Sequence, residues 1–291
     1  MTLPVDNHVH SQWSYDTGNR ASMVKACAWA VSMGLPGVAF TEHLDTTVAA
    51  ADDLAAVRCI EAGWTSVIRR LDVDGYFGCL EECRDRYPTL KIYSGVEVGE
   101  CHLFAATTRG VMFGREFDRV LGSLHALPRN GRLVSVSRLL GAEAPSDVLR
   151  LYLAELLEMV RGDAPFQVLA HCDYPLRYWP KDGGEYRAAD FEVEWRLLLR
   201  ALAESGRVLE INTNSPLLSP DVVRWWREEG GDAVTFGSDA HLPWLVGGKF
   251  DLAVDIAESA GFHAGEDPLD FWRSRRVFPG SVVPGQQGGL Q

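Results

Sequence analysis

The chain has 291 residues, of which 46% are hydrophobic, and a formal net charge of −12. No cluster of Lys and Arg accompanies this acidic balance, which argues against long nucleic acids as the main substrate. No apolar run reaches the roughly 18 residues that a membrane-spanning helix needs.

A single α/β barrel commonly reaches about 250 residues, and a chain of this length can bury one large core. We therefore expect one domain over residues 1–278. The Gly-, Pro- and Gln-rich segment 279–291 is expected to be a flexible tail.

The six cysteines are scattered without a C-x-x-C pair, a pattern typical of reduced core residues in an intracellular protein. A motif of two histidines begins at His8, which makes a cleaved signal peptide implausible. We therefore expect a cytoplasmic location.

Short β-prone runs alternate with longer amphipathic stretches, which predicts βα units and a parallel sheet. The predicted strands are Val5–His8, Gly37–Phe40, Lys91–Val96, Val120–Gly122, Gln167–Leu169, Val208–Ile211 and Ala233–Phe236.

Helices are predicted over Ser146–Arg161, where Ser146 can cap, over Phe191–Ser205, and after Ser219, where Pro220 fits the first helical position. Pro128–Pro145 and Tyr174–Ala189 are predicted to be loops over the sheet.

Nearly every predicted strand runs directly into a His, Asp or Glu. Because the C-terminal ends of parallel strands form one face, these side chains should converge although they span positions 8–241. The candidate metal ligands are His8, His10, Asp16, His43, Glu97, His125, His171, Asp239 and His241.

Imidazole and carboxylate groups suit Zn²⁺, Fe or Mn²⁺, whereas Ca²⁺ prefers oxygen ligands only. Alternate residues of a strand point the same way, so His8 with His10, and Asp239 with His241, could each hold one ion. Nine ligands are too many for one tetrahedral ion and suit two or three divalent transition-metal ions.

A single histidine at a strand end is more often a hydrogen-bonded structural residue than a ligand. Here six of the eight histidines fall at strand ends, which favours metal binding. His102 and His263 are the exceptions, and we expect structural roles for both.

The ordered set His8-x-His10, Asp16, His43, Glu97, His125, His171, Asp239-x-His241 resembles the polymerase and histidinol phosphatase (PHP) family. Gly95-Val-Glu-Val-Gly99, Gly122-Ser-Leu-His125 and His171-Cys-Asp-Tyr-Pro-Leu-Arg177 look most like the histidinol-phosphate phosphatases within it. The resemblance covers residues 5–241, and it implies a distorted (β/α)₇ barrel with a trinuclear metal centre.

The same resemblance implies how the ligands divide among the ions. His8, His10, Glu97 and Asp239 would hold the first ion. Glu97, His125 and His171 would hold the second, with Glu97 bridging, and Asp16, His43 and His241 would hold the third.

The resemblance also implies the reaction, which is hydrolysis of a small phosphate ester, L-histidinol phosphate, to L-histidinol and inorganic phosphate without a phosphoenzyme. Glu97, Asp239 and His241 are the expected catalytic residues, with Asp239 or His241 as proton donor to the leaving oxygen. Arg177 follows ligand His171 by six positions and could bind the phosphate, with Arg20 and Arg129 as weaker candidates.

Three other functions stay open. A phosphodiesterase or exonuclease of the same fold would need an open groove with basic flanks. A non-catalytic metal-binding module would be expected beside a polymerase sequence, and none follows. An amidohydrolase would usually carry a metal-bridging lysine at a strand end, and no lysine stands at such a position.

Overall fold

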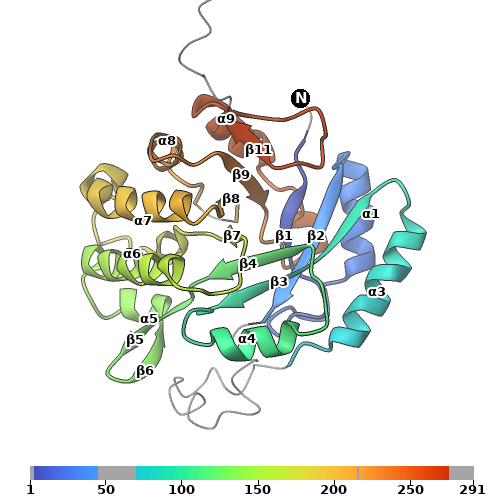
Figure 1. Ribbon diagram of the computed structural model, residues 1–291, viewed down its shortest axis with the longest axis horizontal. Helices are drawn as coiled ribbons and strands as arrows, with labels where there is room; N and C mark the ends of the chain where they lie inside the picture. The colour runs from blue at the N-terminus through green and yellow to red at the C-terminus, as the bar shows by residue number, and fades with distance from the viewer. Residues whose placement is uncertain (1–2, 45–69, 215, 275–291) are drawn as a thin grey trace, which may run out of the picture.

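The computed structural model describes residues 3–44, 70–214 and 216–274, so the predicted tail at 279–291 lies outside the described residues. Seven parallel strands in the described part of the chain form a closed barrel, which confirms the predicted fold (Figure 1). In barrel order they are β1 (Asp6–Val9), β2 (Gly37–His43), β3 (Lys91–Gly99), β4 (Arg119–Ser123), β7 (Val168–Leu169), β8 (Val208–Asn212) and β9 (Ala233–Gly237).

The barrel closes where β1 pairs with β9 through Asp6 and Phe236. Strand β9 has a third neighbour, because Ala233 and Val234 pair with the antiparallel strand β11 (Trp272–Ser274). Strand β11 in turn pairs with β10 (Phe262–His263). Strand β9 therefore pairs with β1 near its C-terminal end and with β11 near its N-terminal end. This division distorts the barrel at the N-terminal end of β9.

Helices surround the strands on the outside of the barrel (Figure 1). They are α1 (Met23–Met33), α3 (Val73–Arg86), α4 (Ala105–Met112), α5 (Val136–Leu140), α6 (Pro145–Arg161), α7 (Glu192–Glu204), α8 (Pro220–Glu228) and α9 (Phe250–Ser259). Within the described ranges, no helix combines the length and apolar character needed to span a bilayer.

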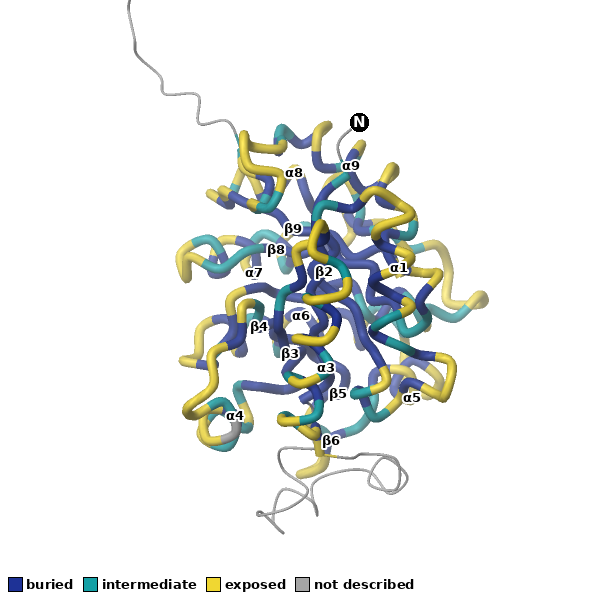
Figure 2. The backbone as a smooth tube through the Cα atoms, turned by 90° about the vertical axis from the view of Figure 1, so that its right-hand side faces the viewer, coloured by how far each residue is buried: buried dark blue, intermediate teal, exposed yellow. Residues whose placement is uncertain are grey.

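Helix α6 shows why these segments fold against the barrel. Leu149, Leu153 and Leu156 recur at helical spacing and are fully buried, while the opposite face is exposed. Each such leucine stabilises the fold by about 1.5–3 kcal/mol relative to an exposed one. Figure 2 shows the same division around the whole barrel, with buried strands inside and exposed helix faces outside.

The predicted helix boundaries are close to the observed ones. Helix α7 lies within the predicted Phe191–Ser205, and α8 begins at Pro220 after Ser219, as expected. The predicted cap at Ser146 is wrong, because α6 begins one residue earlier with Pro145 in its first turn and Ala144 as N-cap.

The segment Pro128–Pro145, predicted to be a loop, is largely ordered. Strands β5 (Ala126–Arg129) and β6 (Arg132–Ser135) form an antiparallel hairpin, and α5 follows directly. Asn130 and Gly131 both have positive φ, 52° and 73°, as the two central residues of a tight hairpin turn require. The prediction overlooked this Asn-Gly signal.

Tyr174–Ala189 carries two short 3₁₀ helices, η1 (Tyr174–Tyr178) and η2 (Ala188–Phe191), joined by irregular chain. Five cysteines lie in the described residues and all are free thiols, four of them buried, as the sequence predicted. Cys59 lies outside these residues.

Candidate metal centre

All nine predicted ligands come together at the C-terminal ends of the barrel strands. His8, His43 and Glu97 lie within β1, β2 and β3, and the others lie in the segments that follow strand ends. Their convergence is a direct result of the parallel barrel, which turns every βα connection toward the same face.

Glu97 lies at the middle of this group and is fully buried. Its Oε1 atom is 2.7 Å from His171 Nε2 and 3.3 Å from His125 Nε2. Its Oε2 atom faces a different set of rings: it is 3.4 Å from His8 Nε2, 3.3 Å from His10 Nε2 and 3.0 Å from His43 Nδ1. The two oxygens of one carboxylate therefore serve two neighbouring clusters of nitrogen atoms.

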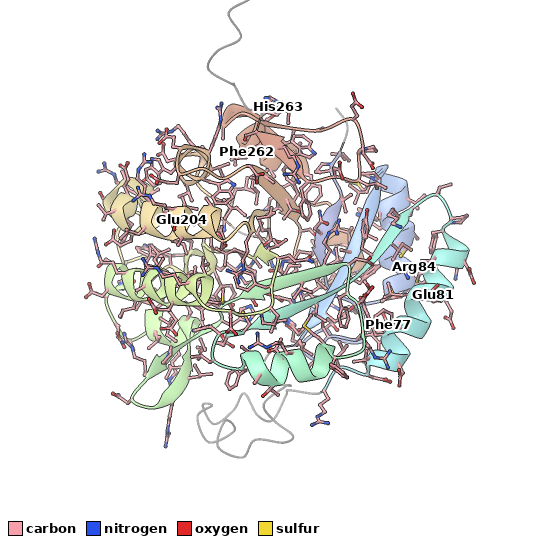
Figure 3. The ribbon with its side chains drawn as sticks, viewed as in Figure 1. Phe77, Glu81, Arg84, Glu204, Phe262 and His263 are labelled. Carbon is pink, nitrogen blue, oxygen red and sulfur yellow. The ribbon has the colours of Figure 1, made fainter. Side chains whose placement is uncertain are left out.

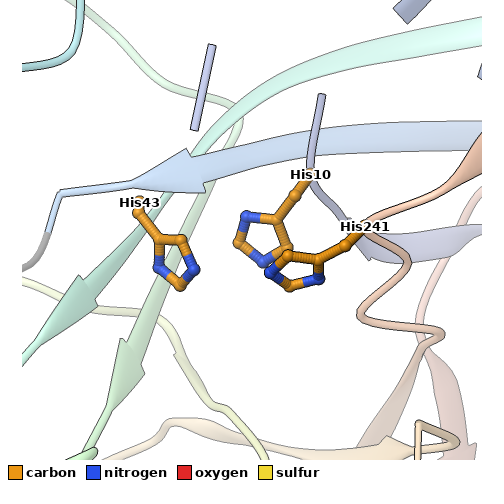
Figure 4. Close-up of side chains that lie close together, drawn as sticks. All are labelled: His10, His43 and His241. Carbon is orange, nitrogen blue, oxygen red and sulfur yellow. The ribbon is translucent and has the colours of Figure 1, made fainter. Parts of the chain in front are cut away.

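The other two carboxylates complete these clusters. Asp239 Oδ1 lies 3.3 Å from His10 Nε2 and 3.7 Å from His8 Nε2. Asp16 Oδ2 lies 3.2 Å from His43 Nε2 and 3.0 Å from His241 Nε2. Figure 4 shows how the rings of His10, His43 and His241 gather, with centroids 4.2 Å and 4.3 Å from His10 to the other two.

The protonation of His10 follows from its hydrogen bonds. Ser14 Oγ donates to Glu42 Oε2 at 2.5 Å and accepts from the His43 backbone N–H at 3.1 Å. Its one proton is thus committed, so the contact of 3.0 Å with His10 Nδ1 has the imidazole N–H as donor. The other ring nitrogen of His10, Nε2, then faces the centre.

His8 is held in the same way, since its Nδ1 lies 2.8 Å from Glu210 Oε1 and its Nε2 points to the centre. The two Nε2 atoms lie only 3.1 Å apart. Two lone pairs at this distance repel unless a positive charge lies between or beside them. Although burial lowers the pKa of His8, the carboxylates of Glu210, Glu97 and Asp239 raise it well above its ordinary value, so this position favours positive charge. Divalent metal ions fit these residues, because they would supply that charge and each ring directs Nε2 toward a shared position.

The electrostatics of the centre favour positive charge. Although burial opposes ionisation, the imidazoles of His43, His8 and His125 hold the pKa of Glu97 well below its ordinary value. Burial also opposes the charge of Asp239, but Arg177 and His8 hold its pKa well below the ordinary range. Both carboxylates are therefore ionised at neutral pH and available to cations.

The stretch after β9 does not behave as a strand. The reasoning that Asp239 and His241 point the same way because of strand alternation is wrong, since β9 ends at Gly237 and Asp239 has a φ of 51°. A turn instead carries both side chains to the centre, where His241 Nδ1 lies 3.6 Å from Asp239 Oδ1.

Of the three candidate arginines, Arg177 on η1 reaches the centre. Its Nη2 lies 2.6 Å from Asp239 Oδ2 and donates to Asn212 Oδ1 at 3.0 Å. Arg129, on the β5–β6 hairpin, pairs instead with Glu143. Arg20 is exposed.

Two aromatic rings lie against the predicted ligands. The ring centroid of Tyr174 lies 5.0 Å from that of His125 and 5.2 Å from that of His171. The ring centroid of Tyr15 lies 5.1 Å from that of His43.

The two remaining histidines have other surroundings. His102 Nε2 lies 2.7 Å from Glu155 Oε1 on α6, a partly buried pair on the outer layer, in agreement with the structural role expected for His102. His263 lies on β10, near the top of the view in Figure 3.

Buried polar residues behind the ligands were missed by sequence reasoning. Glu210 and Asn212 lie on β8, and Glu42 lies on β2 one residue before His43. The available signal was a charged side chain inside a strand of otherwise apolar residues.

Comparison with known proteins agrees with this geometry. The family model of the PHP domain matches residues 6–214. A protein of Clostridium acetobutylicum named "Probable histidinol-phosphatase" is 26% identical over 261 residues, covering 87% of this chain and 92% of the relative. The histidinol-phosphatase of Lactococcus lactis is 25% identical over 269 residues, covering 89% and 92%.

A crystal structure of the histidinol phosphate phosphatase from Lactococcus lactis, complexed with zinc, L-histidinol and phosphate, has a TM-score of 0.75 to this fold at 24% identity. The match covers 90% of this chain and 95% of that chain. The family match extends over most of the sequence and includes seven of the nine residues of the centre, so the chain belongs to the PHP domain family.

Proposed function

We propose that this chain is a metal-dependent phosphomonoesterase that hydrolyses L-histidinol phosphate to L-histidinol and phosphate, a reaction of histidine biosynthesis. The observation that carries the proposal is the position of Glu97, whose two oxygens face two separate groups of imidazole nitrogens. Relatives named histidinol-phosphatase over nearly the whole chain support the choice of substrate.

We propose two to three divalent ions, with Zn²⁺ as the first candidate because the Lactococcus lactis phosphatase was crystallised with zinc. His8, His10, Glu97 and Asp239 would hold one ion. Glu97, His125 and His171 would hold a second, and Asp16, His43 and His241 a third. Contacts of 2.7–3.7 Å join the members of each set. The sets also adjoin one another, because His43 Nδ1 lies 3.0 Å from Glu97 Oε2.

When bound, such ions polarise the phosphate and make a water molecule acidic enough to attack near neutral pH. The chain itself has to hold the phosphate and supply a proton to the leaving oxygen. Arg177 is well placed to hold the phosphate, because its guanidinium lies at the centre. Its Cζ atom is 5.1 Å from the centroid of the Tyr174 ring, against which it packs. Among the described residues no side chain accepts a hydrogen bond from its Nε or Nη1, so both can donate to phosphate oxygens.

Asp239 and His241 are the two candidates for proton donor. Asp239 is 3% exposed and already paired with Arg177, whereas the ring of His241 is 31% exposed. His241 is therefore the better placed of the two to meet the leaving oxygen of an incoming ester.

The test is steady-state kinetics with metal-reconstituted protein on histidinol phosphate, a nucleoside monophosphate, a sugar phosphate and a short oligonucleotide. We expect kcat/KM for histidinol phosphate to exceed the others by about a hundredfold or more, as for a site built around one leaving group. Faster cleavage of the oligonucleotide would favour a phosphodiesterase, and no hydrolysis of any ester would favour a metal-binding module.

A further inference from the structure

Glu210 on β8 is buried behind the centre, with 1% of its surface exposed. It accepts a hydrogen bond from His8 Nδ1 at 2.8 Å through Oε1. Its Oε2 accepts from the His171 backbone N–H at 2.7 Å and from Asn212 Nδ2 at 3.0 Å. One carboxylate thus fastens two of the proposed ligand segments, those of β1 and β7, to a third strand.

An ionised carboxylate can only accept hydrogen bonds, which fixes the proton of His8 on Nδ1. Both oxygens of Glu210 are occupied as acceptors, because three donors surround them: His8 Nδ1–H, the His171 N–H and Asn212 Nδ2–H. The other ring nitrogen of His8, Nε2, faces His10 and Glu97.

Gly237 on β9 provides the space for this carboxylate. A Cβ atom at position 237 would lie 2.0 Å from Glu210 Oε1 and 2.5 Å from the Cβ atom of His8. Any side chain there would displace the contact, so the chain keeps a glycine where the carboxylate meets the neighbouring strand.

Glu210 also reaches the proposed phosphate-binding arginine through one intermediate residue. Asn212 donates to Glu210 with Nδ2, while its Oδ1 accepts from Arg177 Nη2 and from the Asn214 backbone N–H, both at 3.0 Å. Since both ends of the Asn212 amide are used, its orientation is fixed. Glu210 therefore determines which way the acceptor for Arg177 points.

We propose that Glu210 is a positioning residue that sets the Nδ1–H tautomer of His8 and the orientation of Asn212, and so raises the affinity of the centre for its ions. This inference rests on the metal centre proposed above. The carboxylate touches neither substrate nor the proposed ion positions, and it acts through His8 and Arg177.

The substitution Glu210→Gln tests the tautomer directly, because it keeps the size and removes one acceptor. The glutamine side chain has one amide oxygen. It can accept either from His8 Nδ1–H or from the donors of His171 and Asn212, but it cannot accept from both sides. If it takes the latter pair, the amide NH₂ faces His8 Nδ1 and forces the proton onto Nε2. We expect the affinity for Zn²⁺, measured by competition with a chelating dye, to fall about 10- to 100-fold, as for other partners of metal-bound histidines.

Glu155→Gln is the matched control, because it makes the same change in a partly buried Glu–His pair, with His102, on the outer layer. It should leave Zn²⁺ affinity within about twofold of the original chain. Equal Zn²⁺ affinity in Glu210→Gln and the original chain would overturn the inference alone. Absence of Zn²⁺ binding by the original chain would overturn the proposed metal centre as well.

A second measurement determines the tautomer in the original chain and uses a variant only to assign the signal. In ¹⁵N-histidine-labelled, Zn²⁺-loaded original chain, the His8 ring, assigned by its loss in His8→Gln, should carry its proton on Nδ1 and bind through Nε2. Binding of Zn²⁺ through Nδ1 of His8 would overturn the proposal, since that nitrogen would then no longer donate to Glu210.

Discussion

Replacing Arg177 with alanine separates two roles that the structure gives to one side chain. Its guanidinium is 14% exposed and forms a 2.6 Å pair with Asp239, which is 3% exposed. Alanine would leave a buried carboxylate without its cation, and removing one partner of a buried pair typically costs about 3–5 kcal/mol. We expect the free energy of unfolding of the metal-free chain to fall by about 3 kcal/mol, the lower end of this range, because His8 and His10 also lie beside Asp239 Oδ1, at 3.7 and 3.3 Å.

The loss of catalysis is the second expected effect. If Arg177 also donates to the phosphate, kcat/KM of the metal-loaded protein should fall roughly 10²-fold or more, as for loss of a charge-assisted contact. Lysine at this position should restore only part of the rate, because a point charge cannot form two parallel hydrogen bonds. The amount of metal bound at saturating Zn²⁺ should stay the same, since the guanidinium is not a ligand.

Urea unfolding of chelator-treated protein and steady-state kinetics on reconstituted samples measure the two effects on one preparation. Arg109→Ala is the control, because Arg109 forms an exposed pair with Asp163, which is worth about 1 kcal/mol or less. A kcat/KM within about threefold of the original would refute phosphate binding by Arg177 and leave that role to the ions. A free energy of unfolding of Arg177→Ala within about 1 kcal/mol of that of the original chain would refute the stabilising role of the Arg177–Asp239 pair.

Three further outcomes follow from the structure. Elemental analysis of protein purified without chelator should find two to three transition-metal ions per chain, and activity that survives EDTA with less than one ion bound would contradict the centre. Glu97→Gln removes the charge shared by two clusters and should lower kcat by several powers of ten, about 4 kcal/mol or more; more than about a tenth of the original kcat at normal metal loading would exclude the bridging role. Burial and the neighbouring Glu100 raise the pKa of Cys101 to about 12, so mass spectrometry after iodoacetamide at pH 8 should find Cys101 unmodified in the folded chain. Among the five cysteines of the described residues, the partly exposed Cys79 should react first, and equal labelling of Cys79 and Cys101 would contradict this expectation.

The strands of the barrel were accessible from the sequence because each is a short apolar run with a ligand-type residue at its end. The run Gly37–Phe40 and the following Thr-Glu-His, for example, form one continuous strand that ends at His43. The predicted ends of the strands were less accurate than their positions. Strand pairing continues past the apolar run into polar residues wherever the neighbouring strand supplies hydrogen bonds. The register of β2 on β3 extends in this way to His43 and Glu97.

The residues behind the ligands could not be predicted in the same way. Glu210 stands between Leu209 and Ile211, and alternation alone does not show which face of β8 points into the barrel. Its role depends on Gly237, a position on a strand that pairs with β8 only in the folded chain. For Asp239 and His241 the sequence predicted proximity correctly but by the wrong cause, because the backbone turns at Asp239.

The pairing that closes the barrel has a consequence for synthesis of the chain. Strand β1 finds its second neighbour only at Phe236, and the backbone of His10 donates to Ala240 in the same region. At a translation rate of about 5–20 residues per second, the first strand leaves the ribosome more than ten seconds before its partner. During that interval one edge of β1 has no strand to pair with, and His8 and His10 cannot yet meet Asp239. The ligand set of His8, His10, Glu97 and Asp239 is therefore completed only in the last third of translation, whereas Glu97, His125 and His171 are all synthesised before it.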